Sequence, residues 1–154
     1  MRRFGIISED QAMKDGVDLN TVIFPQRATK GSAGYDIYAT KEFILYPHQD
    51  IKIPTGLKVH MNKGEVLVIV PRSGLGFKFY CRLANTLGII DEDYVNADNE
   101  GHIWVKIRNE GNKPMTIKAG EAFCQAIFLP FLITDDDSLD EGEERHGGFG
   151  STSR

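Results

Sequence analysis

The chain has 154 residues, of which 41% are hydrophobic and 26% charged, and its formal net charge is −4. This composition supplies enough apolar material for one domain with its own core and excludes a disordered chain. Because there is no run of about eighteen apolar residues and the first residues turn polar before a signal sequence could form, we expect a cytoplasmic protein without a membrane span.

A helix is predicted near the start of the chain, in the stretch SEDQAMKDG. Ser8 is a typical N-cap, Gln11 follows three residues later as in a capping box, and Gly16 is a typical stop.

Short β-branched or aromatic runs, separated by Gly, Pro, Asn and Asp, fill most of the remaining chain. Their regular spacing favours an all-β sandwich, jelly roll or barrel over alternating strands and helices. The predicted strands fall within 20–26, 33–39, 41–47, 50–59, 64–71, 101–109, 113–120 and 122–131.

Residues 135–144, DDDSLDEGEE, contain seven acidic side chains and no basic one, so the rest of the chain carries +3. We expect a solvated linker here. This divides the chain into a β domain over 1–134 and a linker with a glycine-rich arm over 135–154.

The two cysteines, Cys81 and Cys124, lie far apart in otherwise apolar runs and match no zinc or redox spacing. We interpret both as reduced thiols of the core.

The first group of polar residues that could bind a ligand lies in VIVPRSGLG, residues 68–76. A hydrophobic strand breaks at Pro71 and presents Arg72, Ser73 and Gly74. A guanidinium, a hydroxyl and an open backbone N–H can hold a phosphate. Strand-ending turns also contain such residues for geometry alone.

In LANTLGIIDEDY, residues 83–94, Asn85 and Asp91 flank an apolar run. A carboxylate at the end of such a run can be partly desolvated and serve as a general base. The alternative is that Asp91 opens a turn, Asn85 bonds backbone and Tyr94 is a core aromatic.

Gln125 is the polar exception in the buried strand AFCQAIFLPF. It must find hydrogen-bond partners, either in the backbone or in a site.

The chain ends with RHGGFGSTSR. Such a segment is either slack, as termini often are, or it closes over a phosphorylated ligand that carries a ring.

Taken in order, AGYDIYA, PRSGLG, NTLGIIDEDY, GEAFCQ and RHGGFGST resemble the five motifs of the trimeric dUTPases (deoxyuridine triphosphate nucleotidohydrolases), over residues 32–152. The resemblance implies a distorted jelly-roll barrel with a short N-terminal helix and a flexible C-terminal arm. It also implies a homotrimer with active sites at subunit interfaces. We expect no membrane partner and no direct binding of nucleic acid.

The activity implied by the resemblance is Mg²⁺-dependent hydrolysis of dUTP to dUMP and pyrophosphate by attack of water on the α-phosphorus, which keeps uracil out of DNA and supplies dUMP. Asp91 would activate the water and contact the 3′-hydroxyl. Asn85 and the backbone around Gly88 and Ile90 would read uracil, and Tyr94 would lie under the sugar and exclude UTP sterically.

By the same resemblance, fixed donors would hold the phosphates. Arg72, Ser73 and Gly74 would bind the chain, with Ser73 near the α,β-bridging oxygen. Gln125 would face the α-phosphate. Asp36 would hold Mg²⁺ through water, since Mg²⁺ takes few protein ligands.

The arm would act as a lid over a neighbour's site. Arg145 would face the γ-phosphate and Phe149 would stack on uracil. Backbone at Gly150 and the hydroxyls of Ser151 and Thr152 would cap the γ-phosphate.

The sequence also departs from the family pattern. Ala122 replaces the usual Arg, one residue fewer separates Arg145 from Phe149, and residues 95–101, VNADNEG, form an apparent insertion. That insertion keeps open a second hypothesis, a regulatory binding protein with weak turnover that holds a protein partner through 95–101. A third, dCTP deamination, needs a catalytic Glu where this chain has Lys106.

Overall fold

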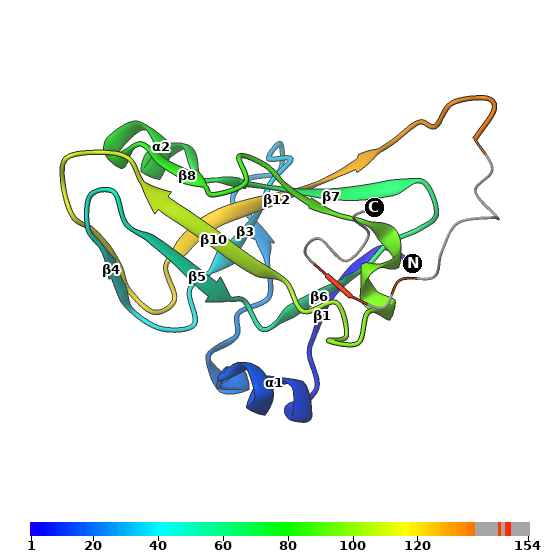
Figure 1. Cartoon of the computed structure of the whole chain (residues 1–154), viewed down its shortest axis with the longest axis horizontal. Coiled ribbons are helices and arrows are strands. Elements are labelled where there is room, and N and C mark those ends of the chain that lie inside the picture. The colour runs from blue at the N-terminus through cyan, green and yellow to red at the C-terminus, as the bar shows by residue number, and fades with distance from the viewer. Residues whose placement is uncertain (138–144, 146, 149–154) are drawn as a thin grey trace.

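Antiparallel strands dominate the structure, a computed structural model that describes residues 1–137, 145, 147 and 148 (Figure 1). The elements in chain order are β1 (Arg3–Ile6), α1 (Glu9–Asp15), the 3₁₀ turn η1 (Leu19–Thr21), β2 (Gln26–Arg27), β3 (Tyr35–Tyr38), β4 (Phe43–Leu45), β5 (Asp50–Pro54), β6 (Leu57–His60), β7 (Glu65–Pro71), α2 (Ser73–Phe79), β8 (Cys81–Leu83), β9 (Gly88–Ile90), the 3₁₀ turn η2 (Glu92–Asn96), β10 (Trp104–Asn109), β11 (Met115–Ile117) and β12 (Ala122–Pro130).

The main sheet has the strand order β2-β3-β12-β7-β9, and a second sheet has the order β5-β10-β8. Two smaller pairs, β1-β6 and β4-β11, complete the described strands. β12 occupies the centre of the main sheet, because it pairs with β3 along one edge and with β7 along the other. The mostly β architecture confirms the predicted fold class.

Apolar side chains that point inward from both sheets form the core. Along β7, Leu67 and Ile69 are buried, while Val66, Val68 and Val70 point to the other face and are only half-buried. This alternation is the period of a strand with one face on the core. Fully buried side chains include Phe123, Ile37, Ile107, Ile103 and Met115.

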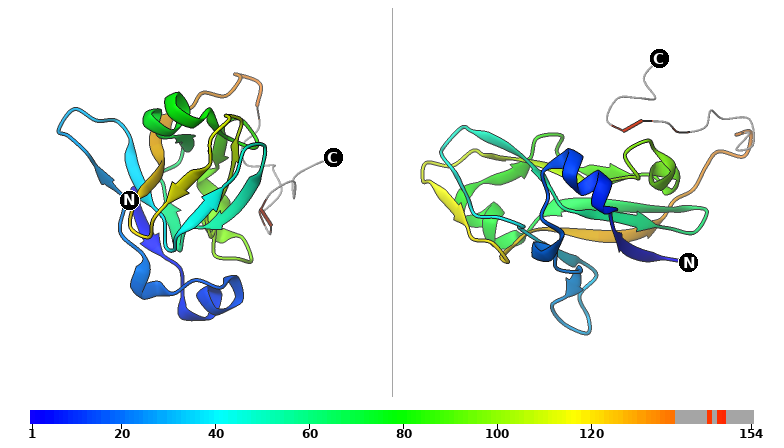
Figure 2. Two further views of the ribbon diagram at one scale, coloured as in Figure 1. Left: turned by 90° about the vertical axis from the view of Figure 1, so that its left-hand side faces the viewer. Right: turned by 90° about the horizontal axis from the view of Figure 1, so that it is seen from below.

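The predicted N-terminal helix is confirmed as α1, which lies outside the strands beside β1 and β6 (Figures 1 and 2). The Ser8 hydroxyl accepts a hydrogen bond from the backbone N–H of Gln11 at 3.2 Å. Gly16 ends the helix with φ of +72°, and its N–H bonds to the carbonyl of Ala12.

Three predictions about local structure were wrong or incomplete. α2 is a second helix that the sequence did not predict, and it leads directly from β7 toward β8. The strand expected over 20–26 is absent except at Gln26, because Asp18 caps η1 there: its carboxylate accepts from the N–H of Asn20 at 3.0 Å. The short strands β1, β8 and β9 were also not among the predicted runs.

Both cysteines are free and buried, as predicted. Burial raises the pKa of the Cys81 thiol to about 11 and that of Cys124 well above its ordinary value. These thiols therefore pack as apolar groups. Among the described residues, no helix has the length and apolarity that a membrane crossing requires.

Candidate active site

Two predicted phosphate-binding side chains, Arg72 and Gln125, and the predicted metal residue Asp36 meet on the main sheet, near the end of β7. Gln125 on β12 lies between Asp36 on β3 and Val70 on β7 in the strand register. Nε of Arg72 is 3.4 Å from Oδ1 of Asp36. We call Asp36, Arg72, Ser73, Gly74 and Gln125 the phosphate cluster, since Ser73 and Gly74 follow directly as the first residues of α2.

The order of the strands explains this meeting. β3 and β12 begin about ninety residues apart in the sequence. They become neighbours because β12 inserts between β3 and β7. The side chain of Gln125 lies close against the backbone of Gly34, and its Nε2 is 3.5 Å from the carbonyl oxygen of Pro71. The cluster thus contains donors from Arg72, Ser73 and Gln125, beside one carboxylate.

A cavity of about 450 Å³ opens beside the segment that connects β8 to β9. Asn85, Gly88 and Ile90, all predicted to bind the base, line it. Gly88 is buried, and a β-carbon there would lie 3.0 Å from Cβ of Ile69 and 3.3 Å from Cδ2 of Leu83. This size suits a small planar ligand, as ligand pockets run from about 300 to 1,000 Å³.

On the opposite wall of the cavity, sequence reasoning missed Lys52 and Trp104, and it considered Lys106 only as an argument against a deaminase. Lys52 on β5 and Trp104 and Lys106 on β10 also line the cavity. The ammonium of Lys52 lies over the Trp104 ring at 4.7 Å, and Nζ of Lys106 is 3.7 Å from Oδ2 of Asp50. Only the pairing of β10 with β5 and β8 brings these residues to the cavity, so a local motif could not have revealed them.

Asp91 follows β9 directly and opens η2. Its side chain is 55% exposed, so the desolvation expected for it is not provided by this single chain. Nη2 of Arg145 lies 2.5 Å from Oδ2 of Asp91, and Nε of Arg145 lies 2.8 Å from Oδ1 of Asp93. Arg145 therefore lies directly beside Asp91, the candidate base.

Tyr94 is 5% exposed, and its hydroxyl donates to the carbonyl of His102 at 2.8 Å. Burial raises its pKa, although the hydrogen bond from Asn99 opposes this. The guanidinium carbon of Arg145 lies 5.9 Å from the ring centre, and Gly148 packs against the ring edge. We call Asn85, Gly88, Ile90, Asp91 and Tyr94 the base cluster.

The two clusters stand apart on one chain. Gly88 on β9 pairs with Ile69, whereas Gln125 on β12 pairs with Val70, so the two clusters lie on opposite edges of β7. Two strand spacings of about 4.8 Å separate β9 from β12, which is about 10 Å across the sheet. The structure therefore brings the predicted residues together as two groups rather than one. The predicted Phe149, Gly150, Ser151 and Thr152 lie outside the described residues.

Within the described part of the chain, no three His, Cys, Asp or Glu side chains converge as metal ligands. The predicted metal residue, Asp36, is 16% exposed and is paired with Arg72. One carboxylate beside phosphate-binding donors suits Mg²⁺, which keeps several waters and takes one or two carboxylates together with substrate phosphates.

Comparison with known proteins identifies relatives across most of the chain. A family profile described as dUTPase matches residues 20–153. A deoxyuridine 5′-triphosphate nucleotidohydrolase of Lactococcus lactis is 46% identical over 129 residues, which covers 83% of this chain and 86% of that protein. One from Tolumonas auensis is 41% identical over 143 residues, covering 88% and 90%.

Solved structures agree with the sequence comparison. A crystal structure of a dUTPase from Streptococcus mutans superposes with a TM-score of 0.71 at 33% identity, over 86% of this chain and 98% of that one. The dUTPase of the Staphylococcus aureus phage phi11 has the same fold, with a TM-score of 0.69 at 20% identity over 93% and 98%. The chain belongs to the dUTPase family.

Proposed function

We propose that this protein hydrolyses dUTP to dUMP and pyrophosphate, which lowers the dUTP available to DNA synthesis and supplies dUMP. The observation that carries the proposal is the division of the site into a cavity of about 450 Å³ lined by Asn85, Gly88 and Ile90 and a separate cluster of phosphate donors at Arg72 and Gln125. A nucleotide needs both halves, one for its base and one for its phosphates.

In this proposal the base enters the cavity beside the segment that connects β8 to β9. Asn85 and the backbone at Gly88 and Ile90 bond the uracil edge, and the Tyr94 ring supports the deoxyribose. A ring that fills the space of a 2′-hydroxyl rejects UTP, since an apolar pocket by itself discriminates poorly against an added hydroxyl.

Asp91 accepts a proton from the water that attacks the α-phosphorus. Gln125 donates to an α-phosphate oxygen, and Ser73 donates to the α,β-bridging oxygen as the bond to pyrophosphate breaks. Arg72 and the N–H of Gly74 hold the remaining phosphate oxygens. Such fixed donors stabilise the charge that spreads over the oxygens in the transition state.

Asp36 would hold Mg²⁺ through water, and the bound ion would neutralise phosphate charge. Arg145, Phe149, Gly150, Ser151 and Thr152 would close over the γ-phosphate and the base as a lid. We propose that this lid serves a neighbouring subunit in a homotrimer, in which the base cluster of one chain faces the phosphate cluster of another.

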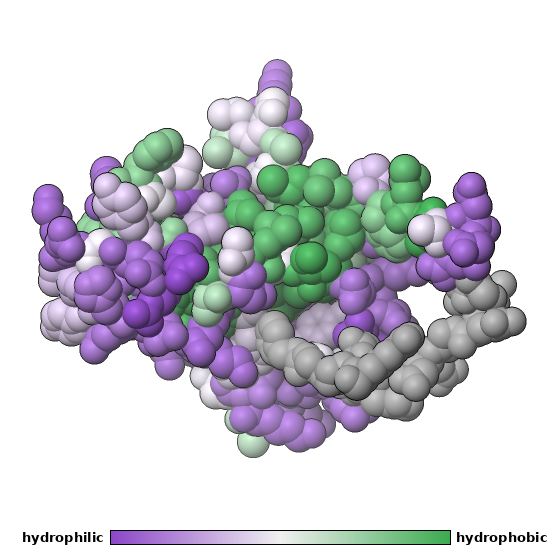
Figure 3. Space-filling model, turned by 45° about the horizontal axis from the view of Figure 1, so that its top comes forward, coloured by the Kyte–Doolittle hydropathy of each residue, from purple (hydrophilic) through white to green (hydrophobic). Residues whose placement is uncertain are grey.

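The outer face of the main sheet supports the trimer. Ile89, Val68 and Ile127 form one cross-strand row on that face, and Val66 stands opposite Leu129. Ile89 is 59% exposed and Leu129 is 44% exposed. Figure 3 shows apolar side chains gathered at the centre of this side of the molecule. An exposed antiparallel face is normally polar, so an apolar one of this kind favours burial against another copy.

The first experiment is the release of pyrophosphate from dUTP, with dCTP, dTTP and UTP in parallel, in Mg²⁺ and after chelation. Mg²⁺-dependent release from dUTP alone is expected. Ammonia release from dCTP would instead favour a deaminase, which Lys106 argues against because an ammonium cannot act as the carboxylate base. Tight dUTP binding without turnover would favour the regulatory binding protein, with Asn96 and Asp98 as the exposed residues of 95–101.

A further inference from the structure

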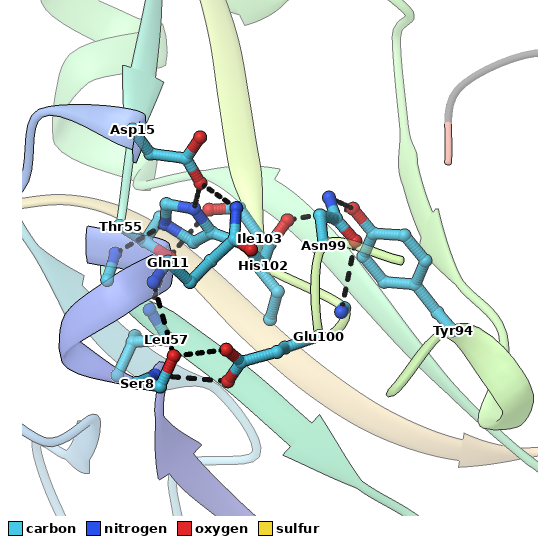
Figure 4. A network of polar contacts seen from close by, with 12 residues as sticks. Ser8, Gln11, Asp15, Thr55, Leu57, Tyr94, Asn99, Glu100, His102 and Ile103 are labelled. Carbon is cyan, nitrogen blue, oxygen red and sulfur yellow. Dashed lines mark hydrogen bonds and ion pairs between the residues drawn. The ribbon is translucent and has the colours of Figure 1, made fainter. Parts of the chain in front are cut away.

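The insertion over residues 95–101 folds back onto Tyr94 (Figure 4). Nδ2 of Asn99 donates to the Tyr94 hydroxyl at 3.0 Å. Oδ1 of the same side chain accepts from the backbone N–H of Gly101 at 3.1 Å. One amide therefore closes a local turn with its oxygen and contacts a predicted sugar-binding residue with its nitrogen.

The hydroxyl of Tyr94 is fixed in direction by these contacts. The hydroxyl has one proton, which it donates in a hydrogen bond to the carbonyl oxygen of His102 at 2.8 Å, because a carbonyl oxygen can only accept. The Asn99 contact must then run from the amide nitrogen to the phenol oxygen. With both the donor and an acceptor site of the hydroxyl used, the ring cannot shift away from its position without breaking two hydrogen bonds.

The insertion is itself anchored to the N-terminal helix. The Glu100 carboxylate accepts from the Ser8 N–H at 3.0 Å and from the Ser8 hydroxyl, and Nζ of Lys58 lies 3.0 Å from it. Glu100 has φ of +62°, an uncommon conformation for a residue with a side chain, which persists where surrounding contacts hold it.

A second anchor lies beside it, at the buried His102. Nε2 of His102 accepts from the N–H of Gly56 at 2.9 Å, so the proton of the neutral ring is on Nδ1, 2.5 Å from Oδ2 of Asp15. The carbonyl of His102 accepts the hydrogen bond from the Tyr94 hydroxyl, while its ring contacts Asp15 of α1. α1 and the insertion therefore together hold the Tyr94 hydroxyl in place.

We propose that Asn99 is a positioning residue for Tyr94 and thereby sets how strictly this protein rejects ribonucleotides. This inference rests on the proposed function, in which the Tyr94 ring lies under the deoxyribose. Steric exclusion of a 2′-hydroxyl works only if the excluding ring stays in place. A ring held by one hydrogen bond instead of two yields more readily to the extra hydroxyl of UTP.

The test uses Asn99→Ser, because a serine oxygen can still accept from the N–H two residues on but is too short to reach Tyr94. Loss of one hydrogen bond corresponds to about a 3- to 10-fold change, so kcat/KM for UTP relative to dUTP should rise by that factor. Asp98→Ser, an exposed neighbour in the insertion, is the matched control and should leave the ratio unchanged.

Tyr94→Phe separates positioning from general damage to the fold. If Asn99 acts through the phenol oxygen, Asn99→Ser should add nothing to the UTP/dUTP ratio in a Tyr94→Phe background. An additional rise there, or an unchanged ratio in Asn99→Ser alone, would overturn the proposal.

A measurement without turnover keeps this inference distinct from the proposed function. In protein carrying ¹³Cζ-labelled tyrosine, the signal that disappears in Tyr94→Phe reports the hydroxyl. It should shift in Asn99→Ser and stay in place in Asp98→Ser, and an unshifted signal would refute the contact. If the signal shifts but the wild-type chain hydrolyses no dUTP, the contact stands, while the proposed function and the specificity role both fall.

Discussion

The side-chain oxygen of Gln125 lies 2.2 Å from the position that a β-carbon at Gly34 would take. Gln125 can therefore lie across β3 beside Asp36 only because residue 34 has no side chain. The far end of a glutamine is flexible, so an added methyl group would displace the amide rather than disrupt the sheet.

Gly34→Ala should consequently reduce dUTP hydrolysis while leaving the denaturation midpoint nearly unchanged. Removal of one donor to a developing oxyanion costs about 100- to 1,000-fold in kcat. We therefore expect kcat to fall by similar factors in Gly34→Ala and in Gln125→Ala, and the double variant to show no larger loss than either single variant. Gly31→Ala is the control, since a β-carbon there meets no atom within 4 Å. Full activity in Gly34→Ala would show that the amide position is irrelevant.

Asp91→Asn should retain dUTP binding and lose most turnover, because an amide cannot accept the proton of the attacking water. A general base contributes about 100- to 10,000-fold, and calorimetry alongside steady-state kinetics would separate binding from chemistry. Asp93→Asn removes the other carboxylate that pairs with Arg145 and should keep turnover. Equal losses in both variants would point to the placement of Arg145 instead of base catalysis.

Leu129→Lys should convert the proposed trimer to monomers of about 17.2 kDa in light scattering. Leu129 is 44% exposed in the single chain, so the lysine should cost the monomer little, whereas burial of an unpaired charge between copies is strongly unfavourable. Ile44→Lys, at a 50% exposed site on β4 in another sheet, should leave the proposed trimer intact. A trimeric Leu129→Lys protein would argue against this face as the interface.

The stability of the protein should depend on His102 at mildly acidic pH. Burial lowers the pKa of His102 below its ordinary value of 6.5, although the adjacent Asp15 opposes the shift. The unfolded imidazole thus binds protons more readily than the folded one, so the free energy of unfolding is largest above about pH 6.5 and falls as the pH drops below it.

The matched experiment compares urea denaturation of wild type and His102→Gln from pH 8 to pH 5. The variant should be less stable at pH 8 by about 1–3 kcal/mol, since glutamine loses the ring that packs against Trp104 and holds its amide less rigidly toward Gly56 and Asp15. The difference should shrink toward pH 5. His60, whose pKa burial also lowers, contributes equally to both proteins. A difference that does not vary with pH would exclude titration of His102.

Local signals in the sequence predicted elements whose causes are local. The caps at Ser8 and Gly16 fix α1 wherever the rest of the chain lies. The sequence of α2, SGLGFKF, contains two glycines and has no side-chain hydrogen bond at its N-cap, so nothing in its own residues predicts a helix. For segment 20–26 a strand was predicted that did not form before Gln26. Hydrogen bonds from Asn20 and Thr21 to Asp18 stabilise a 3₁₀ turn there in spite of the β-branched residues.

The same distinction applies to the site. Arg72, Ser73, Asn85 and Asp91 lie in motifs that are recognisable along the chain, and the resemblance of those motifs to the dUTPase family implied roles for them. Trp104 and Lys106 line the cavity through strand pairing, and Asn99 reaches Tyr94 through a turn inside an insertion. Such contacts follow from the fold and have no signature in the linear sequence.

The central position of β12 also has a consequence for how the protein is made. β12 pairs with β3, about ninety residues earlier, and with β7 on its other side. A ribosome-bound chain cannot join these two strands until residues 122–130 have emerged, so most of the main sheet must form after synthesis of the body is complete. Folding dominated by such distant pairings is slow, and the edges of β3 and β7 stay open to other chains until β12 closes them.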